Sequence, residues 1–409
     1  MYSIIMSTSY YEKYLKYKSK YINLINKKNL IGGAIPKNPN AKLVIIDTDP
    51  GIDDSMALLL ALGSPHLKVI AITTVFGNHP NVKIMTDNAM KILDLANCSH
   101  IPVYEGCGMP MTSYASDADY VARNKMGATQ SMRIHGETGI GEGKLLALLP
   151  SSRPGPSEGH AVDKIIELVK SKPNQITLIT LGPLTNLARA LEIAPEIGPL
   201  FKEVIVMGGA LFAPRGHPIN TPDANLGNAK PSVEANFMKD PEAADIVFSK
   251  TSTNPLNKSI IPCEKLILIP LDTTTQTDYL TSGLEKFLAS RNIISTLIGS
   301  FLLYNHEFYV DAYINIFKRK IVPLHDSCAV FYAINPHNFR KPHHIDVRID
   351  LGTLATKGRT IIDNRTGFNI PGVDKWTSRA TYYETINAEA LYDSIRNSIT
   401  TLIQHARLQ

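Results

Sequence analysis

Apolar runs and amphipathic runs alternate along most of the 409-residue chain. Short and nearly continuous apolar runs, typical of strands that are covered on both faces, occupy residues 42–47, 68–77, 176–182, 203–209 and 265–272. Segments with helical spacing of apolar residues follow or separate them, at 55–63, 81–96, 161–171, 184–193, 241–249, 276–318, 323–334 and 387–406. This alternation predicts an α/β fold with an open, mostly parallel, doubly wound (Rossmann-like) sheet and helices on both faces.

Three stretches depart from the alternation. Residues 110–160 are rich in Gly, Ser and Pro and hold few apolar runs, so they predict a long excursion from the sheet. Residues 208–233 predict a second long loop, whereas residues 344–363 alternate in the manner of a β-hairpin.

Residues 1–40 differ in composition from the rest of the chain. Residues 1–30 hold six lysines, no arginine and one acid, so they carry a charge equal to the +5 of the whole chain. The remainder is close to neutral, and the basic pI is therefore no sign of a nucleic-acid-binding body. We expect residues 1–40 to be a flexible or weakly helical leader followed by a Gly/Pro/Asn linker; a basic patch for nucleic acid or anionic lipid, or a presequence, are the alternatives.

Cysteine spacing and hydropathy bear on the compartment. The four cysteines show no C-x-x-C spacing, which disfavours a disulfide scaffold or structural zinc and favours a reducing compartment. No apolar stretch approaches the roughly 18 residues of a membrane span, and the N-terminus lacks the apolar core of a signal peptide. We therefore expect a cytoplasmic protein with no membrane partner, and no nucleic-acid partner for its body.

The stretch "IIDTDPGIDD" concentrates four aspartates, Asp47, Asp49, Asp53 and Asp54, where the first strand turns into a helix. A helix N-terminus favours one or two acids there, but four like charges this close need a counter-charge. A bound cation would supply it, and hard oxygen ligands without nearby His or Cys favour Ca²⁺ or Mg²⁺. Capping and turn chemistry alone is the alternative.

Polar residues follow other predicted strands or begin later helices, where ligands bind in open α/β sheets. Each place also has a simpler interpretation as a turn, a polar loop or a helix cap. The residues concerned are Asn78, the carbonyl of Leu181, Asn228, Glu234, Asn236 and the pair His325-Asp326.

The order of these motifs resembles the nucleoside hydrolases of the inosine–uridine-preferring type. "DTDPGIDD" matches the N-terminal signature of that family, and "IHGETGIG", "GPLTNLA", "MGGA", "LHD" and "GRTIID" follow in the family's order. The resemblance covers residues 41 to about 405. It implies that residues 41–409 form a catalytic domain with the nucleoside hydrolase fold.

The resemblance also implies a reaction, the Ca²⁺-dependent hydrolysis of the N-glycosidic bond of ribonucleosides to free base and ribose. The implied Ca²⁺ ligands are the carboxylates of Asp49, Asp54 and Asp326 and the carbonyl of Leu181. Asp53 would be the general base and His325 the acid toward the leaving base. Asn78, Asn228, Glu234 and Asn236 would bind the ribose hydroxyls, His135 would lie near the pocket mouth, and a homodimer or homotetramer is implied.

Two features depart from the family pattern. Ser327 stands where proline is common, and residues 211–226 form a long insertion near the expected pocket. The insertion carries Arg215 and His217, either of which could meet the base, although a decorated surface loop is the simpler interpretation. Tyr304, Tyr309 and Tyr313 follow helical spacing, which indicates core packing unless one of them stacks on the base.

Two other functions fit parts of the sequence. A D-x-D phosphohydrolase would use Asp47 as nucleophile, but Pro50 and Gly51 do not suit that motif and the later motifs would have no explanation. A non-catalytic nucleoside-binding protein on the same fold would retain the sugar contacts without turnover.

Overall fold

The computed structural model describes residues 38–111, 131–141, 155–211, 227–229, 233–248, 261–353, 355–363 and 379–407. Most of the predicted leader and residues 212–226 of the insertion, with Arg215 and His217, lie outside these residues, so neither prediction is tested.

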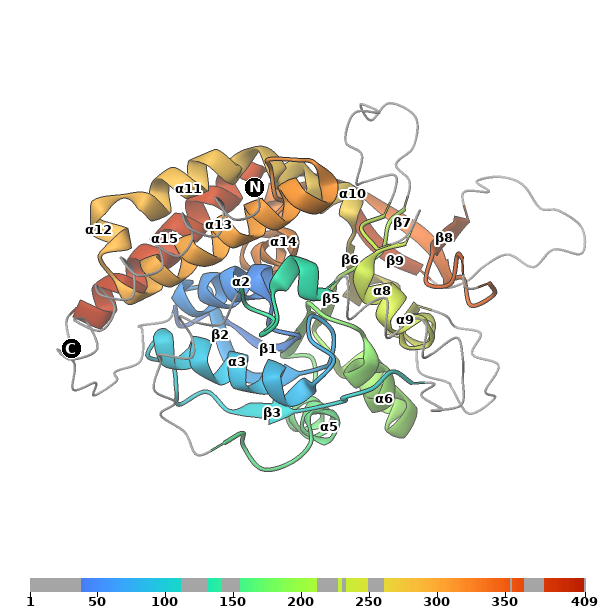
Figure 1. Cartoon of the computed structure of the whole chain (residues 1–409). Coiled ribbons are helices and arrows are strands. Elements are labelled where there is room, and N and C mark those ends of the chain that lie inside the picture. Colours follow the sequence, from blue (N-terminus) through green and yellow to red (C-terminus); the bar gives the residue numbers. More distant parts are fainter. Residues whose placement is uncertain are drawn as a thin grey trace, which may run out of the picture.

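A single nine-stranded sheet organises the described chain (Figure 1). Its strand order is β3-β2-β1-β4-β5-β6-β9-β7-β8, and the pairs from β3 to β9 are parallel while β7 is antiparallel to both neighbours. The strands are β1 (Lys42–Thr48), β2 (Leu67–Thr74), β3 (Val103–Glu105), β4 (Ile176–Thr180), β5 (Glu203–Met207), β6 (Leu266–Ile269), β7 (Phe339–Ile349), β8 (Thr360–Asp363) and β9 (Arg379–Ile386). The expected mostly parallel α/β fold is confirmed.

Helices cover both faces of this sheet (Figure 1). One apolar core contains residues of α2 (Ile52–Gly63), α3 (Val82–Leu95), α11 (Thr281–Ala289), α13 (Leu297–Phe317), α14 (His325–Ile334) and α15 (Ala388–Arg407). The other contains residues of α5 (Ala161–Ser171), α6 (Thr185–Ile193) and α9 (Pro241–Phe248). Shorter helices, α8 (Ala235–Lys239), α10 (Leu271–Thr274) and α12 (Arg291–Ile294), lie between the longer elements.

The central strand β1 shows why these strands are apolar along their length. Val44 and Ile46 belong to the first core and Ile45 to the second, because successive side chains of a strand point to opposite faces. All three are fully buried. Alternating polar positions would leave one face of the sheet without a partner layer, so the continuous apolar run is what a doubly covered strand requires.

Sequence periodicity placed most elements correctly and missed several. β3 has three residues, β9 follows a polar stretch, and α8 has five residues, so each falls short of a clear periodic signal. β9 nevertheless joins the parallel part of the sheet to the β7–β8 hairpin. The helical region expected at 276–318 is divided into a 3₁₀ turn and the helices α11, α12 and α13.

The fold leaves polar groups at one edge of the sheet. The chain runs from β1 outward to β2 and β3 and then returns to place β4 on the other side of β1. Ligand sites form at such a reversal, outside the carboxyl ends of the strands. The four cysteines are free, and no helix among the described residues is long and apolar enough to cross a membrane.

Candidate active site

The turn from β1 into α2 buries its acids. Asp47, Asp49 and Asp54 are at most 1% exposed, and the side chain of Asp53 is 11% exposed. Burial raises the pKa of all four carboxyl groups, to about 7 for Asp47 and about 6 for Asp49. Such a cluster is costly unless hydrogen bonds or a cation compensate it.

Asp47 is held behind the others by a network of neutral groups. Its Oδ1 accepts hydrogen bonds from the Thr73 hydroxyl at 2.6 Å and from the Asn186 side chain at 2.7 Å. Asn186 also donates to the carbonyl of Thr74 and accepts from the amide of Cys107. Asp47 therefore ties β1 to β2 and α6, which supports an orienting role.

Asp49 fits a slot with no room for neighbouring side chains. A Cβ atom on Gly77 or Gly182 would collide with its carboxylate, so both positions require glycine for close approach. The Asn78 amide donates to Oδ2 at 2.7 Å, and the Lys239 ammonium contacts the same oxygen at 3.2 Å. Oδ1 has no hydrogen-bond partner among the described residues.

Asp54 is anchored from three sides. Its carboxylate accepts hydrogen bonds from the Thr48 hydroxyl, from the Gly51 amide at 2.8 Å and from the Asn78 side chain at 3.0 Å. The Gly51 contact also caps the start of α2. These hydrogen bonds fix the Asp54 carboxylate close to that of Asp326, which comes from another helix.

Asp53, Asp54 and Asp326 offer carboxylate oxygens that all lie within 4.8 Å of one another, so this group could hold a metal ion. Asp326 comes from the first turn of α14, far away in the sequence. Burial and the neighbouring acids raise its pKa. A divalent cation would relieve both effects, and an all-oxygen donor set suits Ca²⁺ or Mg²⁺.

The structure differs in detail from the expected ligand set. Asp49 lies outside this group of three, whereas Asp53 belongs to it. The Leu181 carbonyl accepts a hydrogen bond from the Asn236 side chain at 2.7 Å. Its second lone pair could still meet a cation.

A second wall of the pocket is built around α8. Glu234 is its N-cap and accepts from the amides of Asn236, Phe237 and Gly209 at 2.8, 3.1 and 3.1 Å. Asn228 accepts from the Ala235 amide at 2.9 Å. These expected ribose contacts thus also hold their own loop in place.

The third wall is aromatic and comes from α13. Tyr309 packs against both His135 and Tyr313, with ring centroids 5.8 and 4.9 Å apart, and Tyr313 packs on Phe317. Tyr309 and Tyr313 line the pocket, whereas Tyr304 belongs to the apolar core. Core packing describes Tyr304. Tyr309 and Tyr313 are also buried, in a small apolar cluster with Ile52 and Val322, and they line the pocket as well.

Two histidines face this wall, and both are neutral at pH 7. Nδ1 of His135 accepts a hydrogen bond from the Ile52 amide. Burial lowers the pKa of His135 to about 3, so the 3.8 Å contact between its Nδ1 and Oδ1 of Asp53 is not an ion pair. Burial lowers the pKa of His325 to about 4. The Thr274 hydroxyl lies 2.7 Å from Nδ1 of His325, and the Tyr313 hydroxyl lies 3.5 Å from its Nε2.

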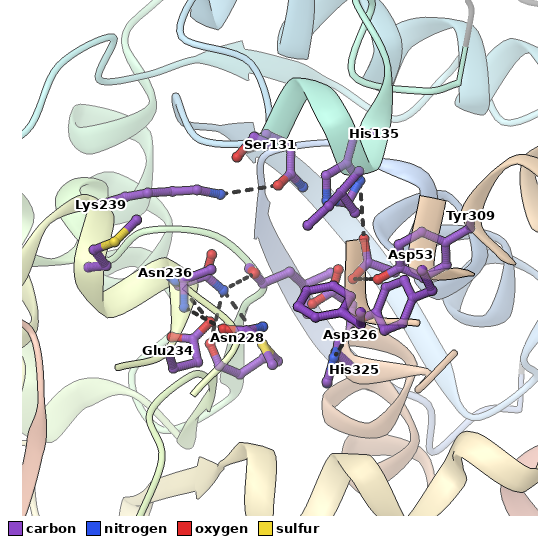
Figure 2. A pocket seen from close by; sticks show the side chains of 18 residues that line it. Asp53, Ser131, His135, Asn228, Glu234, Asn236, Lys239, Tyr309, His325 and Asp326 are labelled. Carbon is purple, nitrogen blue, oxygen red and sulfur yellow. Dashed lines mark hydrogen bonds and ion pairs between the residues drawn. The ribbon is translucent and has the colours of Figure 1, made fainter. Parts of the chain in front are cut away.

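The three walls enclose one pocket, shown in Figure 2. Most of the predicted site residues line it: Asp53, Asn78, His135, Leu181, Asn228, Glu234, Asn236, His325 and Asp326. Asp49 and Asp54 lie directly behind this lining and contact Asn78. The roles assigned to these residues remain proposals, but the structure brings them together.

The same order of motifs has a match among known proteins. A family model described as inosine-uridine preferring nucleoside hydrolase matches residues 44–393. The chain belongs to this family. It is 33% identical over 323 residues to the inosine-uridine preferring nucleoside hydrolase of Leishmania major, which covers 79% of this chain and 88% of that protein.

Other relatives of this nucleoside hydrolase differ in the base that their names state. A pyrimidine-specific ribonucleoside hydrolase of Shewanella is 32% identical over 327 residues, covering 78% of this chain and 86% of that protein. The structure of a purine-preferring ribonucleoside hydrolase from Gardnerella vaginalis matches with a TM-score of 0.69 and 28% identity, over 89% of this chain and 99% of that one. A plant nucleoside hydrolase matches with a TM-score of 0.70 and 29% identity, over 88% and 99%. Family membership therefore leaves the preferred base open.

Sequence reasoning missed part of the lining of this nucleoside hydrolase pocket. Ser131, Ile134, Met207, Met238 and Lys239 all face it. The first two lie in the stretch read as an excursion, and Met207 ends an apolar strand. Lys239 ends a five-residue helix, where no periodic signal indicates its direction.

Proposed function

We propose that the protein hydrolyses the N-glycosidic bond of ribonucleosides to free base and ribose, with Ca²⁺ as its cofactor. The observation that carries this proposal is the buried group of Asp53, Asp54 and Asp326 at the pocket floor, in a chain of the nucleoside hydrolase family. Cleavage of this bond builds positive charge on the ribose, and fixed carboxylates stabilise such charge.

The residues present fit a divalent cation. Asp54 and Asp326, with Asp49 and the Leu181 carbonyl beside them, would hold it, and the partnerless Oδ1 of Asp49 would gain a partner. The ion would lower the pKa of the attacking water and offset the acidic charge. Hard oxygen donors with no His or Cys among them support Ca²⁺ over zinc.

Asp53 is our candidate for the general base. It lines the pocket, its Oδ1 has no hydrogen-bond partner among the described residues, and the Tyr309 hydroxyl donates weakly to its Oδ2 at 3.5 Å. Burial raises its pKa, which strengthens it as a proton acceptor. Asp49 is the second candidate because its Oδ1 is equally without a partner.

His325 is our candidate for assisting the departing base. The Thr274 hydroxyl can donate to Nδ1, which places the ring proton on Nε2, toward Tyr313 and the pocket. Because burial keeps the imidazole neutral at pH 7, Nε2–H would stabilise the leaving base by donating a hydrogen bond. Full proton transfer to the base would require the imidazole to be protonated first.

The rival function is a nucleoside-binding protein without turnover. No matched acid is lost from the cluster, which favours the enzyme. A cytoplasmic location and a homodimeric or homotetrameric assembly remain predictions from the sequence.

The deciding experiment is free-base release from inosine, adenosine, guanosine, uridine and cytidine, with and without chelation of Ca²⁺. We expect release of base and ribose that is lost on chelation and regained on adding Ca²⁺. Binding of nucleosides without release from any of them would support the binding protein instead. Release that survives full chelation would remove Ca²⁺ from the proposal but keep the hydrolase.

A further inference from the structure

Lys239 places a buried cation in the wall of the pocket. Its side chain is 6% exposed and extends from the end of α8 across to the β1–α2 side (Figure 2). The ammonium lies 3.2 Å from Oδ2 of Asp49 and 3.1 Å from Oδ1 of Asn78. Burying a charged lysine costs free energy unless the charge is paired or hydrogen-bonded. Lys239 also lines the pocket.

Two of the three N–H bonds of this ammonium are accounted for in the described part of the chain. The third has no acceptor there. Because Lys239 lines the pocket, the third N–H can donate to a ligand atom.

The side chain of the neighbouring Asn78 has no free hydrogen-bond donor for a ligand. Its side-chain NH₂ donates to the Asp49 carbonyl and to the Asp54 carboxylate, each at 3.0 Å. Its Oδ1 accepts from Lys239. Both donors of the amide are thus engaged within the protein, whereas Lys239 keeps a donor for a ligand.

The local charge indicates what kind of atom Lys239 would meet. Asp53, Glu234 and Asp326 line the pocket, and Asp49 and Asp54 lie behind it. Five carboxylates around one ammonium and one divalent ion would repel an anionic group such as a phosphate. A neutral hydroxyl oxygen can accept the hydrogen bond without that cost.

We propose that Lys239 is a specificity-determining residue that donates a hydrogen bond to a sugar hydroxyl of the nucleoside. The inference rests on the proposed nucleoside hydrolase function and adds a contact to it. Removing the hydroxyl would leave a buried ammonium donor without an acceptor, so the enzyme would reject the deoxy analogue. The contact exists before the bond breaks, so its loss should appear mainly in KM.

The test is a cycle between the side chain and the hydroxyl. Wild type and Lys239→Met are compared on one accepted nucleoside and on its 2′-, 3′- and 5′-deoxy analogues, with kcat and KM measured separately. We expect wild type to discriminate against one of the three analogues about 10-fold more strongly than Lys239→Met does, as for a hydrogen bond to a charged donor. Equal discrimination by both proteins on all three analogues would overturn the proposal and leave Lys239 as a counter-ion of Asp49.

Two further proteins keep the test interpretable. Lys357→Met removes a largely buried ion pair with Glu242, 2.7 Å long, from a lysine outside the pocket lining, and should discriminate as wild type does. The same change in discrimination in Lys357→Met would mean that loosening near α8, and not the contact, causes it. Lys239→Arg keeps the charge and should recover part of the discrimination if Lys239→Met folds poorly.

Calorimetric binding of ribose and its 2-, 3- and 5-deoxy forms separates this inference from the proposed function. If no nucleoside is hydrolysed, the hydrolase proposal fails while sugar binding still tests Lys239. The contact is supported if wild type binds one deoxy sugar more weakly than ribose and this difference is smaller in Lys239→Met. Identical binding patterns in the two proteins contradict it.

Discussion

The β1–α2 wall and the α8 wall of the pocket hold polar residues in opposite ways. On the β1–α2 wall, hydrogen bonds fix the acids yet leave Oδ1 of Asp49 and of Asp53 without partners among the described residues. On the α8 wall, Glu234 spends both carboxylate oxygens on backbone amides. Acceptor oxygens on the first wall are thus left for the proposed cation and the attacking water, whereas Glu234 on the second wall stabilises the backbone of its own loop.

This difference suggests a division of labour. A reacting group must keep a lone pair available, while a positioning group must be immobile. Substitutions on the β1–α2 wall should therefore affect kcat and metal binding, and substitutions on the α8 wall should affect KM and stability.

The largest effect is expected from Asp53→Asn. Loss of the general base should lower kcat by roughly 10²- to 10⁴-fold, because the amide cannot accept the proton. Calorimetry should show Ca²⁺ affinity changed only a few-fold. Asp49→Asn is the matched comparison, since Oδ1 of Asp49 also has no hydrogen-bond partner among the described residues. Full turnover in Asp53→Asn, together with loss of turnover in Asp49→Asn at unchanged Ca²⁺ affinity, would transfer the role to Asp49.

Asp54→Ala should weaken Ca²⁺ binding by about 100-fold or more, because it removes a cation ligand and frees the Thr48 and Asn78 donors that face it. Calorimetric titration of the folded variant measures this directly. Asp87→Ala, which removes a surface acid paired with Lys91, serves as the control. An unchanged Ca²⁺ affinity in Asp54→Ala would falsify the ligand assignment.

His325→Ala tests the role of the histidine beside the aromatic wall. It should slow poor leaving bases roughly 10- to 100-fold more than an activated p-nitrophenyl riboside, which needs no help to depart. Thr274→Val should give a smaller effect of the same kind, because it frees the imidazole to adopt either tautomer. Equal losses on both substrates would argue against a role at the leaving base.

The two walls were unequally predictable from the sequence. Four aspartates after an apolar strand indicated a cation on the β1–α2 wall, because strand ends and like charges carry local signals. Asp326 required the motif order, since only the fold brings α14 to the same place. Glu234 accepts hydrogen bonds both from the start of α8 and from the amide of Gly209, and only the folded backbone shows this.

Lys239 marks the limit of sequence reasoning more clearly. In the sequence it is a single lysine between Met238 and Asp240, and a lysine is usually solvated. Its burial follows from the packing of α8 against the pocket and from an acceptor, Asp49, in the turn between β1 and α2, far away along the chain. β9 was missed for a related reason, since its place in the sheet depends on pairing with β6 and β7.

Glu234→Ala should test the structural half of the comparison. Three backbone amides would lose their acceptor, so we expect the free energy of unfolding to fall by about 2 kcal/mol, at the upper end for a helix cap. Urea unfolding measures this, and Glu234→Gln, which keeps one carbonyl acceptor, should lose less. Unchanged stability with a raised KM would show that Glu234 acts on the substrate and is dispensable as a cap.

The smallest effect concerns α13, the helix of the aromatic wall. His306 is buried with Nε2 3.2 Å from the Thr281 carbonyl, and burial lowers its pKa to about 4 from an ordinary 6.5. The unfolded chain therefore binds a proton between these pH values while the folded chain does not, so stability falls as the pH drops through this window.

From pH 7 to 5.5 this titration should lower the free energy of unfolding by roughly 1 kcal/mol. His306→Asn, whose amide can still donate to the Thr281 carbonyl, should not show this loss. Urea unfolding of both proteins at the two pH values gives the difference, in which the similar contributions of His135 and His325 cancel. Parallel losses in the two proteins would mean that His306 titrates alike in the folded and unfolded chains.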